Sequence, residues 1–350
     1  MGHYLRAPMS RFRPLASLAR QPRPRVVAVT GSAGFLGSNL VGALEDDDRV
    51  ARVVAIDASP TPTAGRKTRA YDVDLSEPTA DARVAEIFAA EHVDTLAHLA
   101  FLPQPAYGAA WAHELESVGT RHVTVAALQA QVRKLLLWSH TWLYGAHPSN
   151  PNFLTEKHPL RAPSTEPFFA DKIEAEGQAR KLAQRSPGAI VTILRTAPIL
   201  GPTVRNAVTQ YLARRIVPTM MGFDPLVQLL HEVDVVAAFH LAVIRDAPGT
   251  FNIVSDGVLP LSTVIKLAGR IALPLPGPLV QTIAAVGWAA HLVEAPPSFL
   301  KYLRFLCVAD GLKARDELGF VPTYSTREAL LDFVNAQRLR DLKLLTESTA

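Results

Sequence analysis

Cysteine is almost absent from this sequence, because Cys307 is the only one among 350 residues. A single thiol excludes an internal disulfide, which is typical of proteins from a reducing compartment. We therefore predict a cytoplasmic location. We predict no metal site.

An excess of charge of one sign is also missing. The formal net charge is +4, and the first 25 residues contribute six arginines and no acid. We interpret residues 1–24 as a disordered basic arm, with an arginine-rich transit peptide as the alternative. No basic face with interleaved aromatic residues follows, so nucleic acid is not an expected partner.

Long uninterrupted apolar runs are lacking too. Residues 271–293 carry no charge, but Pro274, Pro276 and Pro278 interrupt their first third. The remainder, 279–293, is shorter than the ~20 residues that a membrane span requires. We predict a buried helix of a small lobe, with an apolar lid or a membrane-surface contact as the alternative.

The first half of the sequence contains a regular alternation of strands and helices. The apolar runs expected to form strands are 26–29, 53–57, 94–100, 134–140 and 189–195. The expected helices are 79–91, 113–132 and 171–186. This order predicts an α/β protein with a doubly wound parallel sheet, the Rossmann fold, followed by a smaller C-terminal lobe.

A glycine-rich turn joins the first expected strand to the helix after it. Gly31, Gly34 and Gly37 have the spacing at which a backbone turn approaches a pyrophosphate, and the following helix presents free N–H groups to the anion. Asp57 ends the next strand, where its carboxylate would accept hydrogen bonds from ribose hydroxyls and repel a 2′-phosphate. We therefore predict NAD as the cofactor.

The chain resembles the extended short-chain dehydrogenase/reductase family, also called the NAD-dependent epimerase/dehydratase group. TGSAGFLGSNLV at 30–41 is similar to the opening motif of that family. The similarity continues through these segments: HLA at 98–100, VGT at 118–120, WLYG at 142–145, LRTAPILGP at 194–202, LLHEVDVVAAFHLA at 229–242, FNIVSDG at 251–257 and ARDELGF at 314–320.

The resemblance implies a set of cofactor-binding residues. The glycine turn would contribute backbone groups, Asp74 and Leu75 would meet the adenine, and Lys172 would bind the nicotinamide ribose. The residues implied are Gly31, Ala33, Gly34, Phe35, Leu36, Gly37, Asp57, Asp74, Leu75, Leu99, Ala100, Lys172, Ala197 and Ile199. The implied domains are a Rossmann domain, 25–200 with 231–256 returning to it, and a substrate lobe, 201–230 with 257–340.

The active centre departs from the family pattern. Phe168 stands where the family has its proton-donating tyrosine, and His140 stands where it has Ser or Thr. Glu116 replaces the usual Asn, so Lys172 is the one residue of the four that is retained. Because phenylalanine cannot move a proton, this chain resembles an atypical member that binds the cofactor but lacks the usual acid–base group.

Two residues are candidates to replace the tyrosine. His140 titrates near neutral pH as a free side chain, and a hydrogen-bonded strand-end histidine is the alternative interpretation. Ser139 would supply a hydroxyl after a small backbone shift. Tyr107 and His113 have no spacing that singles them out, and Tyr144 belongs to the YG pair, where a packed residue is the default interpretation.

Two functions remain open at this point. The first is an NAD-dependent oxidoreductase, epimerase or dehydratase with a non-standard acid–base group; the alternative is a non-catalytic NAD(H)-binding sensor or interaction protein. The ligand would be a small molecule in the cleft between the lobes. Arg205, Arg214 and Arg215 favour a sugar diphosphate there, unless they form a solvated helix face, whereas 271–293 favours a hydrophobic ligand. A homodimer also stays open.

Overall fold

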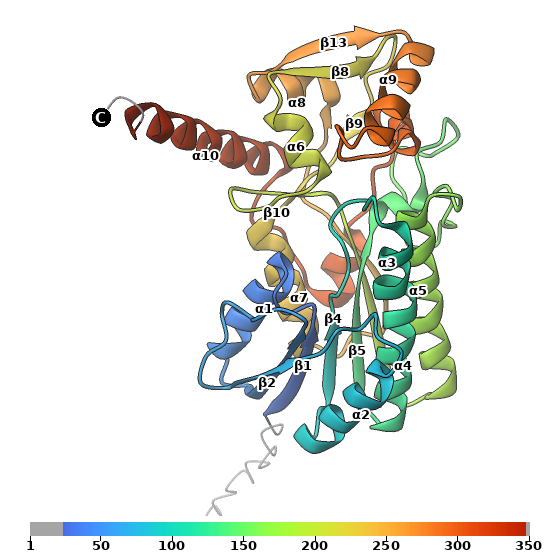
Figure 1. Cartoon of the computed structure of the whole chain (residues 1–350), viewed down its shortest axis with the longest axis vertical. Coiled ribbons are helices and arrows are strands. Elements are labelled where there is room, and N and C mark those ends of the chain that lie inside the picture. Colours follow the sequence, from blue (N-terminus) through green and yellow to red (C-terminus); the bar gives the residue numbers. More distant parts are fainter. Residues whose placement is uncertain (1–23, 348–350) are drawn as a thin grey trace, which may run out of the picture.

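The computed structural model describes residues 24–347, with side chains described as far as residue 340. Residues 1–23 of the expected basic arm lie outside this range. The described chain forms a main α/β body with a smaller lobe stacked at one end (Figure 1).

A seven-stranded parallel sheet forms the main body, in the order β11-β6-β5-β4-β1-β2-β3. All five strands expected from the apolar runs are present, so the predicted α/β class is confirmed. The strands are β1 (Arg25–Thr30), β2 (Val50–Asp57), β3 (Thr68–Asp72), β4 (Thr95–His98), β5 (Lys134–His140), β6 (Ile190–Thr196) and β11 (Gly249–Ile253).

Helices cover both faces of this sheet (Figure 1). On one side are α1 (Phe35–Glu45) and α7 (Glu232–Ile244). On the other are α2 (Ala80–Glu91), α3 (Ala109–His113), α4 (Gly119–Gln129) and α5 (Pro167–Arg185). A π-helical turn, Glu114–Val118, joins α3 to α4 within the expected helix 113–132. Helix α5 begins four residues before the expected 171, because Pro167 occupies its first turn, where a missing N–H costs nothing.

The smaller lobe has a core of its own, which includes Leu212, Leu229, Val264 and Phe333. Short strands join the lobe to the main body or pair within it: β7 (Ile199–Leu200), β8 (Ile216–Met220), β9 (Leu226–Val227), β10 (Leu230–His231), β12 (Leu259–Pro260) and β13 (Ile271–Leu275). Its helices are α6 (Ala207–Ala213), α8 (Leu261–Leu267), α9 (Gly277–Ala289) and α10 (Thr326–Glu347), with a 3-10 segment, Pro297–Leu303.

The chain returns to the main body once more than the sequence suggested, and then goes back to the lobe. Ala309, Ala314, Leu318 and Phe320 pack in the core of the main body, although they lie within the lobe expected over 257–340. Helix α10 then returns to the lobe core through Leu330 and Phe333. Segment 309–320 therefore belongs with the Rossmann sheet.

The charge-free segment 271–293 forms β13 and α9. A helix is present where one was predicted over 279–293, but the prediction that this helix is buried is wrong. Val280 and Gly287 are buried, but Leu279, Ile283 and Val286 are 46%, 48% and 63% exposed. The helix packs on the lobe with one face only, so the exposed apolar side chains of its other face have no packing partner in the described chain. Within residues 24–347, no helix is long and apolar enough to cross a bilayer.

Candidate cofactor and substrate site

The glycine turn between β1 and α1 requires glycine at two of its three positions. Gly31 has a φ of +71°, and a Cβ built there would lie 2.6 Å from the Ala100 backbone nitrogen. A Cβ on Gly37 would lie 2.0 Å from the Gly31 carbonyl oxygen. Gly34 precedes α1 without a capping side chain, which leaves the N–H groups of the first turn free for an anion.

Asp57 ties the end of β2 to this turn. Its Oδ2 accepts a hydrogen bond from the Ala33 backbone N–H at 3.0 Å, and its Oδ1 accepts one from Ser59 at 3.0 Å. The carboxylate is therefore held beside the glycine turn, at the position where it would meet the ribose of a dinucleotide.

A cleft of about 160 Å³ opens at the carboxyl ends of these strands. This is where ligands bind in a doubly wound sheet. It unites seven of the expected cofactor residues: Gly31, Gly34, Phe35, Leu36, Gly37, Leu99 and Ile199. The other seven expected residues do not line it: Ala33, Asp57, Asp74, Leu75, Ala100, Lys172 and Ala197. Of these, the Asp74 carboxylate is held by Ser76, from which it accepts the backbone N–H at 2.9 Å and the hydroxyl at 2.6 Å.

Phe168 lines the cleft and covers Lys172. The Lys172 Nζ lies 3.7 Å from the centroid of the Phe168 ring and donates to both carboxylate oxygens of Glu116, at 2.8 and 2.7 Å. Glu116 also accepts the Leu102 backbone N–H at 2.6 Å. Both charged side chains are 1–2% exposed. The geometry therefore turns Lys172 away from the cleft and towards Glu116.

Burial acts on both members of this pair. It raises the pKa of Glu116 and lowers the pKa of Lys172, and in each case the charge of the partner offsets part of the shift. The two hydrogen bonds from the ammonium to the carboxylate favour the ionised pair, since hydrogen bonds between charged groups are stronger than those between the neutral forms.

His140, at the end of β5, is brought to the cleft as expected. Its ring lies 5.9 Å from that of Phe168 and 5.1 Å from that of Trp138. Its Nε2 is buried and has no hydrogen-bond partner in the described chain. Burial, helped by the nearby Lys172 charge, lowers the pKa of His140 to about 3, so the ring is uncharged at neutral pH.

Ser139 is not brought to the cleft, which corrects the expectation that it replaces the missing hydroxyl. Its Oγ donates to Glu176 at 2.6 Å, inside a buried network on the other side of β5. In that network Arg195 donates to both Glu176 oxygens, at 2.8 and 2.6 Å, and to the Tyr144 hydroxyl at 2.9 Å. Neighbouring strand residues point to opposite faces, so Ser139 and His140 cannot both face the cleft.

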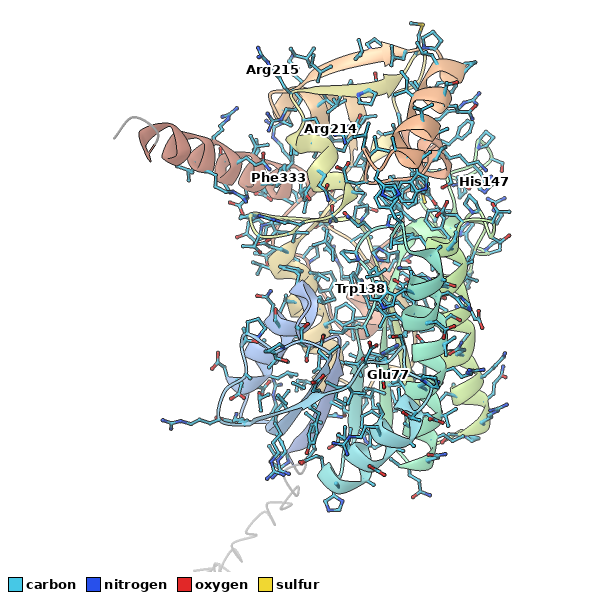
Figure 2. All side chains as sticks on the ribbon, viewed as in Figure 1. Glu77, Trp138, His147, Arg214, Arg215 and Phe333 are labelled. Carbon is cyan, nitrogen blue, oxygen red and sulfur yellow. The ribbon has the colours of Figure 1, made fainter. Side chains whose placement is uncertain are left out.

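The three arginines considered for a diphosphate do not meet at one place. Arg205 lines the cofactor cleft, whereas Arg214 pairs with Glu294 at 2.8 Å. Arg215 is exposed at the outer end of the lobe, far from Trp138 in the cleft (Figure 2). The solvated or paired interpretation therefore fits Arg214 and Arg215.

Several residues of the site were not found by sequence reasoning. The pairing of Glu116 with Lys172 was missed, although a carboxylate in place of the usual Asn was a signal for it. Trp138, Trp142 and Phe299 also line the cleft. Phe299 lies 131 positions after Phe168 in the chain, and no local pattern joins them.

The glycine turn, the free first turn of α1 and Asp57 together fit the diphosphate and ribose of a dinucleotide. Residues 27–254 match the family model described as the NAD dependent epimerase/dehydratase family. The chain belongs to this family. The expected cofactor, NAD, is confirmed by membership of this family, because the family is NAD-dependent and the residues present fit NAD.

Other comparisons found similar proteins. An uncharacterized protein of Mycobacterium tuberculosis is 36% identical over 324 residues, which are 90% of this chain and 85% of that protein. The 3-diazoavenalumate denitrifying reductase of a Streptomyces species is 28% identical over 315 residues, 87% of this chain and 98% of its own length. The solved structure of MoeE5 in complex with UDP-glucuronic acid and NAD has a TM-score of 0.71 at 24% identity, covering 90% and 99% of the two chains. That likeness shows the fold alone.

The family match establishes an epimerase/dehydratase-family protein of oxidoreductase type. Among residues 24–340, whose side chains the structure describes, no three His, Cys, Asp or Glu side chains are grouped so as to hold a metal ion.

Proposed function

We propose that this protein is an NADH-dependent reductase whose acceptor needs no proton from the enzyme. The proposal rests on the residue at position 168. Phe168 stands in place of the proton-donating tyrosine, and its ring covers Lys172, whose ammonium pairs with Glu116. NADH supplies a hydride when it is bound. The chain itself binds and orients the two reactants and excludes water.

The polar side chains of the cleft support this proposal, since none is a ready acid at neutral pH. They are Gln104, His140, Arg205 and Asn206. Gln104 accepts a hydrogen bond from Gln210, and Asn206 holds the start of α6. A guanidinium keeps its proton in proteins, and the pKa of His140 is about 3.

Because the cleft has no proton donor, some hydride acceptors are better suited to it than others. A ketone that receives a hydride becomes an alkoxide, and losing a positioned acid slows its reduction by about 10²–10⁴-fold. A cationic acceptor becomes neutral and needs no proton. For an arenediazonium ion, the hydride forms a C–H bond at the ring carbon that bears the diazonium group. The electron pair of the C–N bond leaves with the nitrogen, and the products are arene, N₂ and NAD⁺. The name of the Streptomyces relative, a denitrifying reductase of a diazo compound, supports this class.

The test uses purified protein with NADH deuterated at C4, in both stereoisomers. We expect deuterium from one isomer to enter the arene from a stable arenediazonium salt, well above the rate without protein. Acetophenone should be reduced at least about 100-fold more slowly. The diazonium rate should show no ionisation between pH 6 and 8, because the cleft has no group that titrates there. Equal rates for ketone and diazonium would overturn the proposal.

A gain-of-function variant tests the same reasoning from the other side. Phe168→Tyr combined with His140→Ser restores the family pattern at two positions, and we expect it to increase ketone reduction without increasing diazonium reduction. The non-catalytic alternative has support from the same missing tyrosine. It predicts that NADH binds while no acceptor reacts faster than in the control without protein, which would exclude the reductase. A cytoplasmic location and a homodimer stay predictions.

A further inference from the structure

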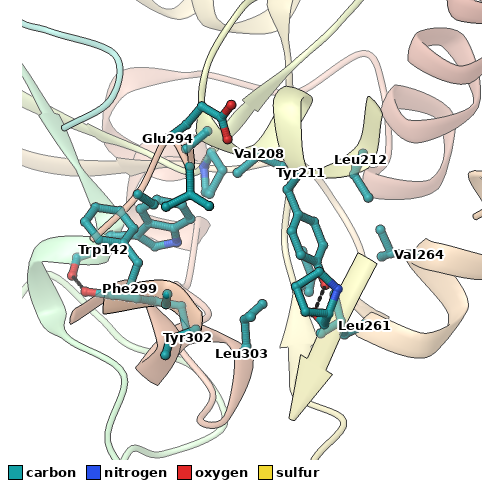
Figure 3. Close-up of a pocket in the computed structure, with 18 of the residues that line it drawn as sticks. Trp142, Val208, Tyr211, Leu212, Leu261, Val264, Glu294, Phe299, Tyr302 and Leu303 are labelled. Atoms are coloured by element: carbon teal, nitrogen blue, oxygen red, sulfur yellow. Dashed lines mark hydrogen bonds between the residues drawn. The ribbon is translucent and has the colours of Figure 1, made fainter. Parts of the chain in front are cut away.

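We propose that an apolar chamber in the smaller lobe binds the uncharged aromatic body of the substrate. Identifying its occupant as the substrate rests on the function proposed above. The chamber has a volume of about 250 Å³ and is enclosed by α6, α8, α9 and the 3-10 segment Pro297–Leu303. Figure 3 shows 18 of the residues that line it.

Aromatic rings form one wall of the chamber. Trp142 lies 5.5 Å from Phe299, edge to face, and 5.0 Å from Tyr302 (Figure 3). Across the chamber are the apolar side chains of α6 and α8, among them Val208, Leu212 and Val264. Such rings offer faces and edges on which another aromatic ring packs favourably.

The polar side chains on the lining are already occupied by the protein, apart from the indole of Trp142. The Tyr302 hydroxyl donates to the Trp142 carbonyl oxygen at 2.6 Å, and the Tyr211 hydroxyl donates to that of Pro218 at 2.8 Å. The Gln228 side chain accepts the Ala309 backbone N–H at 3.0 Å. A ligand with many hydroxyl groups would lose its hydrogen bonds to water and find few replacements here.

The charges of the chamber cancel. Among the described residues that line it, only Arg214 and Glu294 are charged, and they form a salt bridge at 2.8 Å. A nucleotide diphosphate needs cations that are free to pair with it. The chamber therefore suits an uncharged apolar group and is a poor site for the nucleotide of a sugar nucleotide.

The chamber adjoins the cofactor cleft, so that its occupant can reach the hydride. Five residues line both spaces: Trp142, Pro198, Ala207, Val208 and Phe299. A planar molecule held by the aromatic wall would extend towards His140 and Phe168, which line the cleft together with Trp142 and Phe299. This places the reacting carbon at the end of the ligand that leaves the chamber.

Binding of N-phenyl-1-naphthylamine, an uncharged dye whose fluorescence rises in apolar surroundings, tests the chamber directly. The titration uses the full chain with saturating NAD⁺, which keeps the dye out of the cofactor cleft. We expect binding at one site, which UDP-glucose does not displace.

Two substitutions on α9 provide a matched pair. Ile283 lines the chamber and is 48% exposed, so Ile283→Glu puts a charge at its edge without filling the core. Val286 is 63% exposed on the same helix and does not line the chamber. Ile283→Glu should weaken dye binding about 10-fold or more, and Val286→Glu less than about 2-fold, with NAD⁺ affinity unchanged in both.

The outcomes separate the chamber from the reductase. Absent dye binding, equal effects of the two substitutions, or displacement by UDP-glucose would overturn the chamber assignment, even if the diazonium salt is reduced. Dye binding with the expected difference between the variants, but without turnover, would support an apolar ligand site and reject the reductase.

Discussion

Lys172 shows how one substitution changes the role of its neighbours. With a tyrosine at position 168, the ammonium would have a hydroxyl beside it; with Phe168 it lies under a ring, 3.7 Å from the centroid, and bonds to Glu116 instead. A buried ammonium without a partner would lose its proton, so the carboxylate at 116 and the ring at 168 act together. The Lys172 ammonium therefore stays charged inside the protein, but it is not available to a ligand in the cleft.

Removing one member of this pair should destabilise the fold. Glu116→Gln leaves Lys172 buried without its counter-charge, so that it either stays an unpaired ammonium or gives up its proton, and we expect the free energy of unfolding to fall by about 3–5 kcal/mol. Glu114→Gln is the matched control, because Glu114 lies on the same π-helical turn and is exposed; its effect should stay within about 0.5 kcal/mol. Urea unfolding measures both. Similar losses in the two variants would show that Lys172 does not depend on Glu116.

Asp57 should set the preference between NADH and NADPH. Its carboxylate is fixed by the backbone N–H groups of Ala33 and Ser59, so it cannot easily turn away from a 2′-phosphate. We expect calorimetric titration to give tighter binding of NADH than of NADPH, and Asp57→Asn to narrow the difference. Asp48→Asn, at an exposed turn, should leave the preference unchanged. Equal or tighter binding of NADPH by the wild type would contradict this assignment.

At the scale of elements, a buried polar network joins α5 to the sheet. Glu176 on α5 accepts hydrogen bonds from Ser139 on β5 and from Arg195 on β6, and Arg195 also donates to the Tyr144 hydroxyl. The Tyr144 hydroxyl in turn donates to Asn252 on β11 at 2.7 Å. These contacts fix how β5 ends, and therefore which way Ser139 and His140 face.

The two arginines bound to Glu176 should differ widely in their contribution to stability. Arg195 is 2% exposed, whereas Arg180 is 46% exposed. We expect Arg195→Met to lower the free energy of unfolding by about 3–5 kcal/mol, because Glu176 keeps a buried charge. Arg180→Met should cost about 1 kcal/mol or less, since water screens the exposed pair. Chemical denaturation of both variants tests the difference, and comparable losses would rule it out.

At the scale of the whole molecule, two buried histidines make stability depend on pH. Burial lowers the pKa of both His98 and His140 to about 3, compared with about 6.5 when unfolded. Between these values the unfolded chain binds protons that the folded chain does not. Their contribution is therefore complete above pH 6.5 and is lost as the pH falls towards 3.

Each histidine should add a slope of about 1.4 kcal/mol per pH unit over this window. We expect the difference in unfolding free energy between wild type and His140→Phe to change by that amount per unit between pH 6.5 and 5, above the range in which ordinary carboxylates titrate. His92→Asn replaces an exposed histidine in a left-handed conformation that Asn tolerates, so its curve should run parallel to that of the wild type. A parallel curve for His140→Phe would show that its ring is not desolvated.

The sequence by itself determined the parallel sheet, the glycine turn with Asp57, and the exchange of tyrosine for Phe168 one turn before Lys172. These features depend on strand patterns, on backbone sterics and on spacing along one helix, all of which are local. Only the tertiary structure decided that Glu116 takes up the Lys172 charge, that Ser139 turns to Glu176 while His140 faces the cleft, and that segment 309–320 returns to the main core. It also created the apolar chamber from side chains as far apart in sequence as Trp142 and Leu303. Which partner a buried side chain meets depends on packing between elements distant in the chain, and no local pattern encodes that choice.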